Sequence, residues 1–242
     1  MVKFQKTAAL AFLKKVNLDG AIPEFIVEED GSVAAGLGTV LMVFGKDANF
    51  PGFGKKVGIT NPAQLTKFIN AIESADNMIT ASFGGHDLVL AARNTKYAYR
   101  SADPSTVVSM AAHEEKAKAK MPAFPVKVDI TIDQATAIRK AISLLCKTAE
   151  DSVDRVELFA SQGLLQAIVR DDATQSSSSI DVASGVTAEF KTVFLAKYVA
   201  PLLAAVGSSG ATMYLAENSP MFLQLKDSEF VYLIGNVSDS QN

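Results

Sequence analysis

The order of predicted strands and helices constrains the fold more than any other feature, because one unit occurs four times along the 242 residues. Each unit is a short strand, followed by one amphipathic helix and then by three further strands. The helices are predicted at residues 6–16, 61–74, 132–148 and 196–206. Four such units favour a fold in which the helices pack on antiparallel sheet.

The helices are supported by their apolar spacing and by their prolines. In the third helix Ile138, Ile142 and Leu145 recur at the spacing of one helical face, and charged side chains occupy the opposite face. Pro62 is typical of the first position of a helix. Pro201 is compatible with the fourth helix only in its first turn, where the missing N–H costs little.

Short alternating runs of apolar and polar residues predict the strands, and Gly, Asn and Asp predict the turns between them. The predicted strands are 3–5, 24–28, 33–37, 39–44, 56–60, 78–83, 88–93, 96–100, 126–131, 155–161, 164–170, 178–183, 190–195, 212–217, 221–226 and 230–235. Residues 101–125 interrupt this rhythm, because they are rich in Ala, Lys, Glu and Pro and have a weak apolar pattern. We therefore predict an α+β chain of two similar domains, 1–100 and 126–242, joined by this connector, with two helices packed on antiparallel sheet in each.

Positive charge is concentrated in the four predicted helices, although the whole chain carries a net charge of −3. The helices hold eight basic and two acidic side chains, so they carry +6 and the rest of the chain carries −9. The basic residues are Lys6, Lys14, Lys15, Lys67, Arg139, Lys140, Lys147 and Lys197. Charge segregated by structural element favours one basic surface for nucleic acid on a body that repels it elsewhere. Simple solvation of the helices is the alternative interpretation.

Side-chain spacing argues against an enzyme and against a metal site. His86 and His113 have no metal-ligand spacing to each other or to Cys146, the one cysteine. Gly54 and Lys55 lack the earlier glycine and the following hydroxyl residue of a phosphate loop. No apolar stretch reaches the roughly 18 residues of a membrane span. We therefore expect no catalytic residue, metal or cofactor, and a soluble protein of a reducing cytoplasm.

Four segments resemble a known family at the level of individual residues, and they are 101–108, 124–126, 190–206 and 211–217. The first two resemble the entry and the exit of the connector in DNA polymerase sliding clamps of the T-even phage type. The last two are similar to the fourth unit of PCNA-like clamps generally. The repeat of units agrees with this family over the whole chain, whereas residues 113–120 of the connector depart from it. The phage-like segments favour a viral source.

The resemblance implies a DNA-clamp fold assembled head to tail into a closed homotrimeric ring, with the helices around a central hole. Double-stranded DNA in this hole would meet the eight basic helix residues through its phosphates, without sequence readout. The resemblance also implies a replicative DNA polymerase as partner. A clamp loader is a further expected partner, because nothing in the sequence indicates ATP hydrolysis. The protein would then be a processivity factor.

The resemblance implies a second surface, near the connector, that holds a short hydrophobic peptide of a partner protein. The residues expected to line it are Val107, Val108, Met110, Tyr232 and Ile234. Residues 177–183 are the candidate subunit edge, because Ile180 and Val182 alternate with polar neighbours. The alternative for the five pocket residues is ordinary core packing. The alternative for residues 177–183 is an ordinary solvent-facing edge strand.

Two other functions stay open at this point. A non-enzymatic, β-rich structural protein, such as a virion component, would use its lysines only for solvation, and its basic helix faces would share no surface. A hydrolase would have a deep pocket with carboxylates or histidines of shifted pKa. In a clamp, removal of the helix charges would impair loading onto DNA and processive synthesis without loss of folding. In either alternative it would not.

Overall fold

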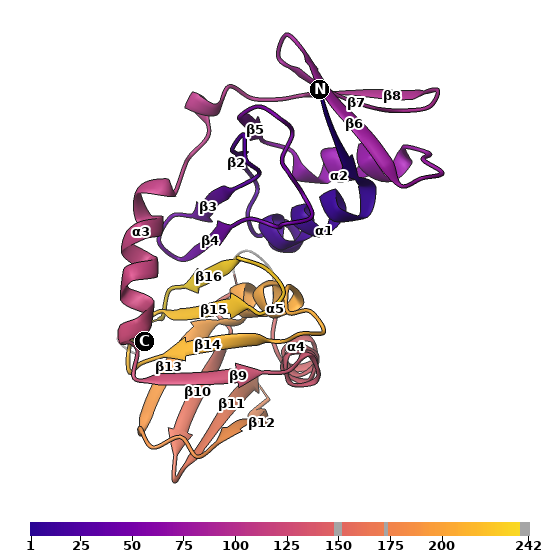
Figure 1. Cartoon of the computed structure of the whole chain (residues 1–242). Helices are drawn as coiled ribbons and strands as arrows, with labels where there is room; N and C mark the ends of the chain where they lie inside the picture. Colours follow the sequence, from indigo (N-terminus) through magenta and orange to yellow (C-terminus); the bar gives the residue numbers. More distant parts are fainter. Residues whose placement is uncertain (148–151, 172–173, 238–242) are drawn as a thin grey trace. The chain divides into compact units, whose positions relative to one another are not determined.

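The computed structural model describes residues 1–147, 152–171 and 174–237 (Figure 1). Its contacts divide the chain into two compact units. The first unit comprises residues 1–37, 42–115 and 228–230, and the second comprises the remaining described residues. Each unit is built from antiparallel sheet and from two of the repeating helices, so the α+β class predicted from the sequence is confirmed.

The first unit contains two repeats of one strand, one helix and three strands. The first repeat is β1 (Val2–Gln5), α1 (Lys6–Asn17), β2 (Phe25–Val27), β3 (Val33–Leu37) and β4 (Leu41–Gly45). The second is β5 (Val57–Ile59), α2 (Pro62–Ala71), β6 (Met78–Gly84), β7 (Asp87–Ala92) and β8 (Thr95–Arg100). One sheet has the order β1-β6-β7-β8, and the other strands follow the order β5-β2-β3-β4.

The second unit repeats the same plan twice more. Its first repeat is β9 (Val126–Ile130), α4 (Ile132–Leu145), β10 (Arg155–Ser161), β11 (Leu164–Asp171) and β12 (Ser176–Ser184). Its second is β13 (Phe190–Leu195), α5 (Ala196–Ala204), β14 (Ala211–Leu215), β15 (Met221–Leu225) and β16 (Val231–Ile234). One sheet has the order β12-β11-β10-β13, and the other strands follow the order β16-β15-β14-β9. The fourfold repeat read from the sequence is therefore present in the structure.

The start of α2 is fixed by side chains around it. The Asn61 side chain accepts a hydrogen bond from the backbone N–H of Gln64 at 3.0 Å, and Pro62 occupies the first turn, as predicted. The hydroxyl of the buried Tyr99 on β8 accepts hydrogen bonds from the backbone N–H groups of Thr60 (3.2 Å) and Asn61 (3.0 Å). Strand β8 therefore holds the point at which the helix begins.

An aromatic cluster fills the core beneath α1. Phe4, Phe12, Phe50 and Phe53 are fully or almost fully buried, and their neighbouring rings lie with centroids 4.5 to 5.8 Å apart. Aromatic side chains bury large apolar areas, and pairs at these separations add a favourable term beyond area alone. The cluster therefore fixes which face of α1 points inward and which face remains outside.

The structure contains a helix in the connector, which the sequence analysis did not predict. Helix α3 (Ala111–Lys120) is flanked by the short 3-10 turns η2 (Pro104–Thr106) and η3 (Met121–Ala123). Its residues are mainly Ala, Lys and Glu, which have high intrinsic helix propensity, and only Ala117 among its side chains is buried. The apolar periodicity used to find the other helices is therefore weak here, although the backbone is helical.

The expected position of Pro201 was wrong. Helix α5 begins at Ala196, so this proline lies in the second turn of the helix rather than in the first. Val199 and Leu202 are buried on the inward face of α5, and their burial maintains the helix through the proline. Three predicted helices were also too long, because α2 ends at Ala71, α4 ends at Leu145 and α5 ends at Ala204. The predicted third helix reached residue 148, which lies outside the described residues.

Candidate nucleic-acid interface

In the first unit, α1 and α2 pack against each other and leave Lys14 and Lys67 exposed. Lys14 lies in the last turn of α1, where the carbonyl end of a helix favours a cation. Lys67 lies on α2 between the buried residues Leu65 and Ile69 and points away from them. Both predicted side chains therefore reach solvent from neighbouring helices.

Lys6 and Lys15 have partners inside the first unit. The Lys6 Nζ donates to the backbone carbonyls of Asn70 (2.8 Å) and Ile72 (2.9 Å) at the end of α2. It satisfies carbonyls that a helix end leaves without an intrahelical partner. The Lys15 Nζ lies 3.0 Å from Oδ2 of Asp47, and the exposed fractions of these two side chains are 15% and 7%. Both lysines therefore connect parts of the unit to each other.

The Lys15–Asp47 pair has the electrostatic properties of a structural contact. Burial alone would raise the pKa of the Asp47 carboxyl, but the backbone N–H of Asn49 and the Lys15 ammonium outweigh burial and hold the pKa below its usual value. The same ammonium lies 5.8 Å from the ring centroid of Phe230. The pair thus fixes the loop after β4 against the last turn of α1.

In the second unit, three of the four predicted basic residues lie on α4 or just after it. Arg139 and Lys140 are exposed on the helix, and Lys147 is exposed just beyond its end at Leu145. Leu144 is 74% exposed and follows Lys140 by four residues, so both lie on the same helix face. Leu144 was not predicted to belong to this surface, although its helical spacing places it opposite the apolar face.

The fourth helix contributes less positive charge. Lys197 is half-buried in the first turn of α5, and its Nζ lies 5.4 Å from the ring centroid of Tyr198. The first turn is the end of a helix at which the backbone dipole disfavours a cation. α4 and α5 pack against each other. The exposed positive charge of this helix pair therefore lies mainly on α4 and just after it.

The residues expected to line a partner-peptide pocket differ sharply in exposure. Val107 and Met110, in the first unit, are only 5% and 6% exposed, whereas Val108 between them is 57% exposed. Tyr232 and Ile234 lie on β16 in the second unit and are completely buried. Four of these side chains therefore contribute to protein cores, and Val108 is the one that a partner can reach in this conformation.

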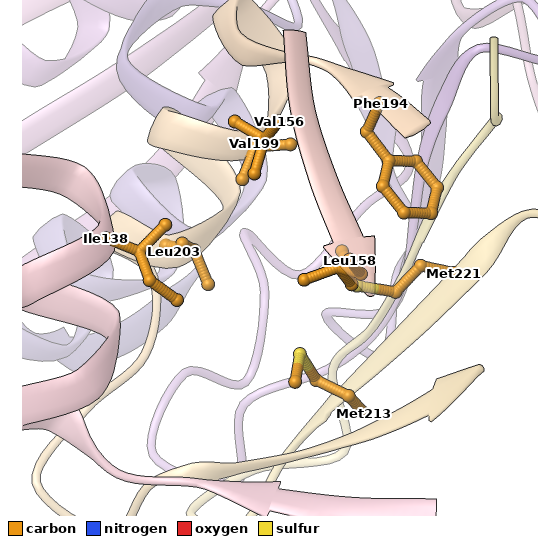
Figure 2. A pocket seen from close by; sticks show the side chains of 8 residues that line it. All are labelled: Ile138, Val156, Leu158, Phe194, Val199, Leu203, Met213 and Met221. Atoms are coloured by element: carbon orange, nitrogen blue, oxygen red, sulfur yellow. The ribbon is translucent and has the colours of Figure 1, made fainter. Parts of the chain in front are cut away.

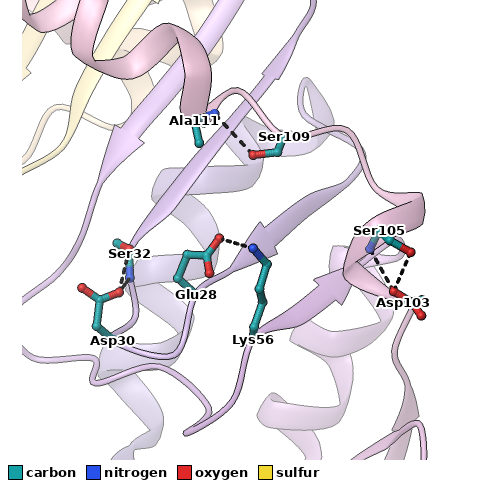
Figure 3. Close-up of polar contacts among 8 residues, drawn as sticks. All are labelled: Glu28, Asp30, Ser32, Lys56, Asp103, Ser105, Ser109 and Ala111. Carbon is teal, nitrogen blue, oxygen red and sulfur yellow. Dashed lines mark hydrogen bonds and ion pairs between the residues drawn. The ribbon is translucent and has the colours of Figure 1, made fainter.

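Polar contacts hold the segment that presents Val108 (Figure 3). The Asp103 carboxylate accepts hydrogen bonds from the backbone N–H (2.9 Å) and the hydroxyl (2.8 Å) of Ser105. The backbone hydrogen bond is the main cause that lowers the pKa of Asp103. The Ser109 Oγ accepts from the backbone N–H of Ala111 at 3.3 Å, at the start of α3. Val108 thus lies between two locally ordered turns.

The gap in the core of the second unit has no features of an active site (Figure 2). It measures about 10 Å³, which is room for about one water molecule, and all eight side chains around it are apolar. They are Ile138, Val156, Leu158, Phe194, Val199, Leu203, Met213 and Met221. Within the described ranges, no group of three or more His, Cys, Asp and Glu side chains is placed to hold a metal ion. None of the described helices combines the length and the apolar character needed to cross a membrane.

Each unit has a four-stranded sheet with a strand at either end. β8 is the last strand of β1-β6-β7-β8, and β12 is the first strand of β12-β11-β10-β13. β8 carries the exposed residues Lys96 and Arg100, whereas β12 carries the exposed Asp181 and several serines. The candidate edge at residues 177–183 lies within β12. Open antiparallel edges present backbone N–H and C=O groups that can pair with a further strand.

The sequence matches no protein-family model and no curated protein sequence. Solved structures of sliding clamps nevertheless share its fold. PCNA from Entamoeba histolytica has a TM-score of 0.71 at 12% identity, over 98% of each chain. A. fulgidus PCNA, in a structure with the C-terminal region of FEN-1 bound, has a TM-score of 0.70 at 14% identity, over 99% of each chain.

A bacterial clamp subunit has the same fold in a longer chain. The beta subunit from the DNA polymerase of Streptococcus pyogenes has a TM-score of 0.67 at 13% identity, and the match covers 98% of the present chain. The present chain spans 65% of the length of that subunit. At these identities the likeness defines the fold alone, and the DNA-clamp fold expected from the resemblance is confirmed.

Proposed function

We propose that the chain is a sliding clamp, a processivity factor that encircles double-stranded DNA and tethers a replicative DNA polymerase. The observation that carries this proposal is the set of exposed basic side chains on the helices of a DNA-clamp fold, or just after them. These side chains are Lys14 and Lys67 in the first unit, with Arg139, Lys140 and Lys147 in the second. In the proposed assembly all of them point toward the DNA phosphates.

The chemistry of these contacts suits sliding. Flexible lysine and arginine side chains neutralise phosphates without reading bases, so the interaction is independent of sequence. A single exposed ion pair contributes on the order of 1 kcal/mol or less, so no one register along the DNA is strongly preferred. Three basic residues with internal contacts would contribute positive potential without bonding to a phosphate directly. They are Lys6, Lys15 and Lys197. The net negative remainder of the chain would disfavour binding of DNA elsewhere.

We propose that the open strands close the ring. Strand β8 of one copy would pair with β12 of the next, because each is an end strand of a four-stranded sheet and the nine residues of β12 can accommodate the six of β8. The two edges have net charges of opposite sign, since β8 carries Lys96 and Arg100 and β12 carries Asp181. Such a head-to-tail contact uses two different surfaces and closes into a ring when the rotation per subunit allows it. A homotrimer of the T-even phage type is the form that we propose.

The proposed partners are a DNA polymerase and a clamp loader. The FEN-1 segment bound to the A. fulgidus clamp supports the idea that a clamp of this fold holds partner peptides. On the present chain we propose that Val108 and the turns beside it form the accessible part of such a surface, because Val108 is 57% exposed. An apolar side chain of a partner that covers Val108 would remove apolar surface from water, and this burial would stabilise the complex.

The proposed DNA surface is tested by charge removal. The variant Lys14→Ala, Lys67→Ala, Arg139→Ala and Lys140→Ala removes four positive charges from the helices. Its affinity for a short fluorescent duplex is expected to fall at least about tenfold, and the dependence of the binding constant on salt should flatten, because fewer counterions are released. Fluorescence anisotropy across a salt series measures both quantities, and two unrelated duplex sequences check sequence independence.

A matched control variant removes the same number of charges from other exposed positions. It combines Lys3→Ala, Lys116→Ala, Lys120→Ala and Lys127→Ala, none of which lies on the four repeating helices. We expect the affinity of this control for DNA to stay within about twofold of that of the unmodified protein. Any loss in the control measures the general effect of net charge. Equal losses in both variants would contradict a helix-lined DNA surface, and unchanged binding in both would favour the β-rich structural protein.

A further inference from the structure

The side chain of Gln134 connects the first turn of α4 to the open strand β12, within the second unit. Its Oε1 accepts hydrogen bonds from the backbone N–H (2.9 Å) and the hydroxyl (3.1 Å) of Thr131, and the Thr131 hydroxyl accepts from the Gln134 backbone N–H (3.2 Å). These contacts form a capping box. On its other side, Nε2 donates to the carbonyl of Val182 at 2.7 Å and faces that of Asp181 at 3.4 Å.

The orientation of this amide follows from its partners. A backbone N–H can only donate, so the atom that faces the N–H of Thr131 must be the amide oxygen of Gln134. The nitrogen must then face β12, where the carbonyl oxygen of Val182 can only accept. Both ends of one side chain are therefore matched, and each end serves a different structural element.

The point at which Gln134 contacts β12 is a bulge in that strand. Leu165 pairs with Ala183 and the next residue, Gln166, pairs with Asp181, so Val182 is an extra residue on β12. Val182 is 3% exposed, which places its side chain in the core. The Gln166 Nε2 donates to the Asp181 Oδ1 at 2.8 Å. The bulge is therefore held by two glutamines from two different elements.

The bulge and Gln134 together limit how much of β12 can receive another strand. A bulge interrupts the regular ladder and twists a strand edge, and natural sheets use such features to end pairing. Residues 176–181 pair with β11 in unbroken register, from Ser176 opposite Asp171 to Asp181 opposite Gln166. The Gln134 amide also faces the Asp181 carbonyl, so residues 176–180 are the part of this run that it does not contact. Five residues in regular strand span roughly 17 Å, which suits the six-residue strand β8.

We propose that Gln134 acts as a register stop for subunit association. It occupies the carbonyl of Val182, and it thereby confines the strand of a second copy of this chain to residues 176–180 of β12. The inference rests on the proposed ring, in which β8 of the neighbouring copy is that strand. Because Gln134 also completes the cap of α4, it links the helix that carries Arg139 and Lys140 to the subunit edge.

The test uses two variants that separate the two ends of the Gln134 side chain. Gln134→Glu retains an acceptor for the Thr131 N–H, since Glu also suits this position of a capping box. It lacks the donor for Val182 and places a carboxylate against that carbonyl. Thr131→Ala is the matched control, because it removes the capping hydroxyl and leaves the contact between Gln134 and Val182.

Sedimentation over a range of concentrations gives the dissociation constant of self-association for each protein. We expect Gln134→Glu to raise this constant about tenfold or more, because a charged, unmatched group then faces the edge. We expect Thr131→Ala to lower the melting temperature and to leave the constant within about twofold. Equal dissociation constants for Gln134→Glu and the unmodified chain, or equal changes in both variants, would overturn the register stop.

Hydrogen exchange on the unmodified protein provides a measurement that does not depend on how the variants fold. On assembly, those amides of residues 176–180 that point away from β11 should gain protection, and the amides of residues 182–184 should not. Protection that continues through residues 182–184 would overturn the register stop and keep the proposed ring interface. An assembled protein with no added protection anywhere in β12, or a chain that stays monomeric at every concentration, would remove the proposed interface and the register stop with it.

Discussion

At the scale of single residues, the partners of the basic side chains decide what each of them can do. Lys6 bonds to carbonyls 64 and 66 residues away in the sequence, and Lys15 pairs with a carboxylate 32 residues away. The sequence locates positive charge on the helices, but only the fold brings such distant partners together. Lys14, Lys67, Arg139 and Lys140 were predicted from helical spacing alone, and the structure leaves them exposed.

The Lys15–Asp47 pair predicts a pH-dependent contribution to stability. Asp47→Asn should lower the free energy of unfolding at pH 7 by about 2 kcal/mol, because a hydrogen bond between charged groups is replaced by a neutral one. The folded-state pKa of Asp47 is lowered, so its contribution is present above the unfolded pKa of about 3.9 and is lost as the pH falls through the folded-state value.

Urea unfolding at a series of pH values measures this contribution. The difference between the unmodified chain and Asp47→Asn should be constant near neutral pH and should shrink below pH of about 4. Glu28→Gln is a suitable control, since Glu28 faces Lys56 at 2.8 Å in an exposed pair that contributes about 1 kcal/mol or less. A difference for Asp47→Asn that grows toward acid pH would contradict the assigned role.

At the scale of elements, the sequence predicts the parts that depend on apolar periodicity. Strands β3, β10 and β13 begin and end where the alternation predicted, because one face of each strand packs on a core. Helix α3 escaped prediction because its Ala- and Lys-rich sequence lacks a wide apolar face. The candidate peptide surface was also only partly predictable, since the sequence does not reveal that Tyr232 is buried on β16.

The prolines of α2 and α5 predict opposite effects of substitution. Pro201 lies in the second turn of α5, where a proline removes a helix hydrogen bond and crowds the preceding turn. Pro201→Ala should therefore raise the free energy of unfolding by about 1 to 3 kcal/mol. Pro62→Ala should instead lower it by up to about 1 kcal/mol, because Pro62 suits the first turn of α2 and restricts the unfolded chain.

Thermal and urea unfolding of the two single variants compare these effects directly. Both substitutions replace proline by the same residue on a helix, so general effects of alanine cancel in the comparison. A loss of stability in Pro201→Ala as large as that in Pro62→Ala would contradict the account of α5. Such a loss would mean that packing of the pyrrolidine ring of Pro201 stabilises the helix by more than the missing hydrogen bond destabilises it.

At the scale of the whole molecule, the proposed function requires several copies of the chain to assemble. The DNA-clamp fold supplies two units of the same plan, each with a pair of helices and an open sheet edge. The fourfold repeat was predictable because every unit satisfies the same local rules of periodicity and turn chemistry. The proposed ring closure would depend on complementary surfaces of two copies, and a single sequence indicates these surfaces only through scattered edge residues such as Lys96 and Asp181.

The mass of the particle in solution tests the central proposal most directly. Light scattering behind a sizing column, at several protein concentrations, should give a mass near three times that of the 25.7 kDa chain. Dilution should shift the mass toward the single chain, as expected for subunits joined through short strand edges. A mass of 25.7 kDa at every concentration would contradict a ring that closes through the edges of β8 and β12.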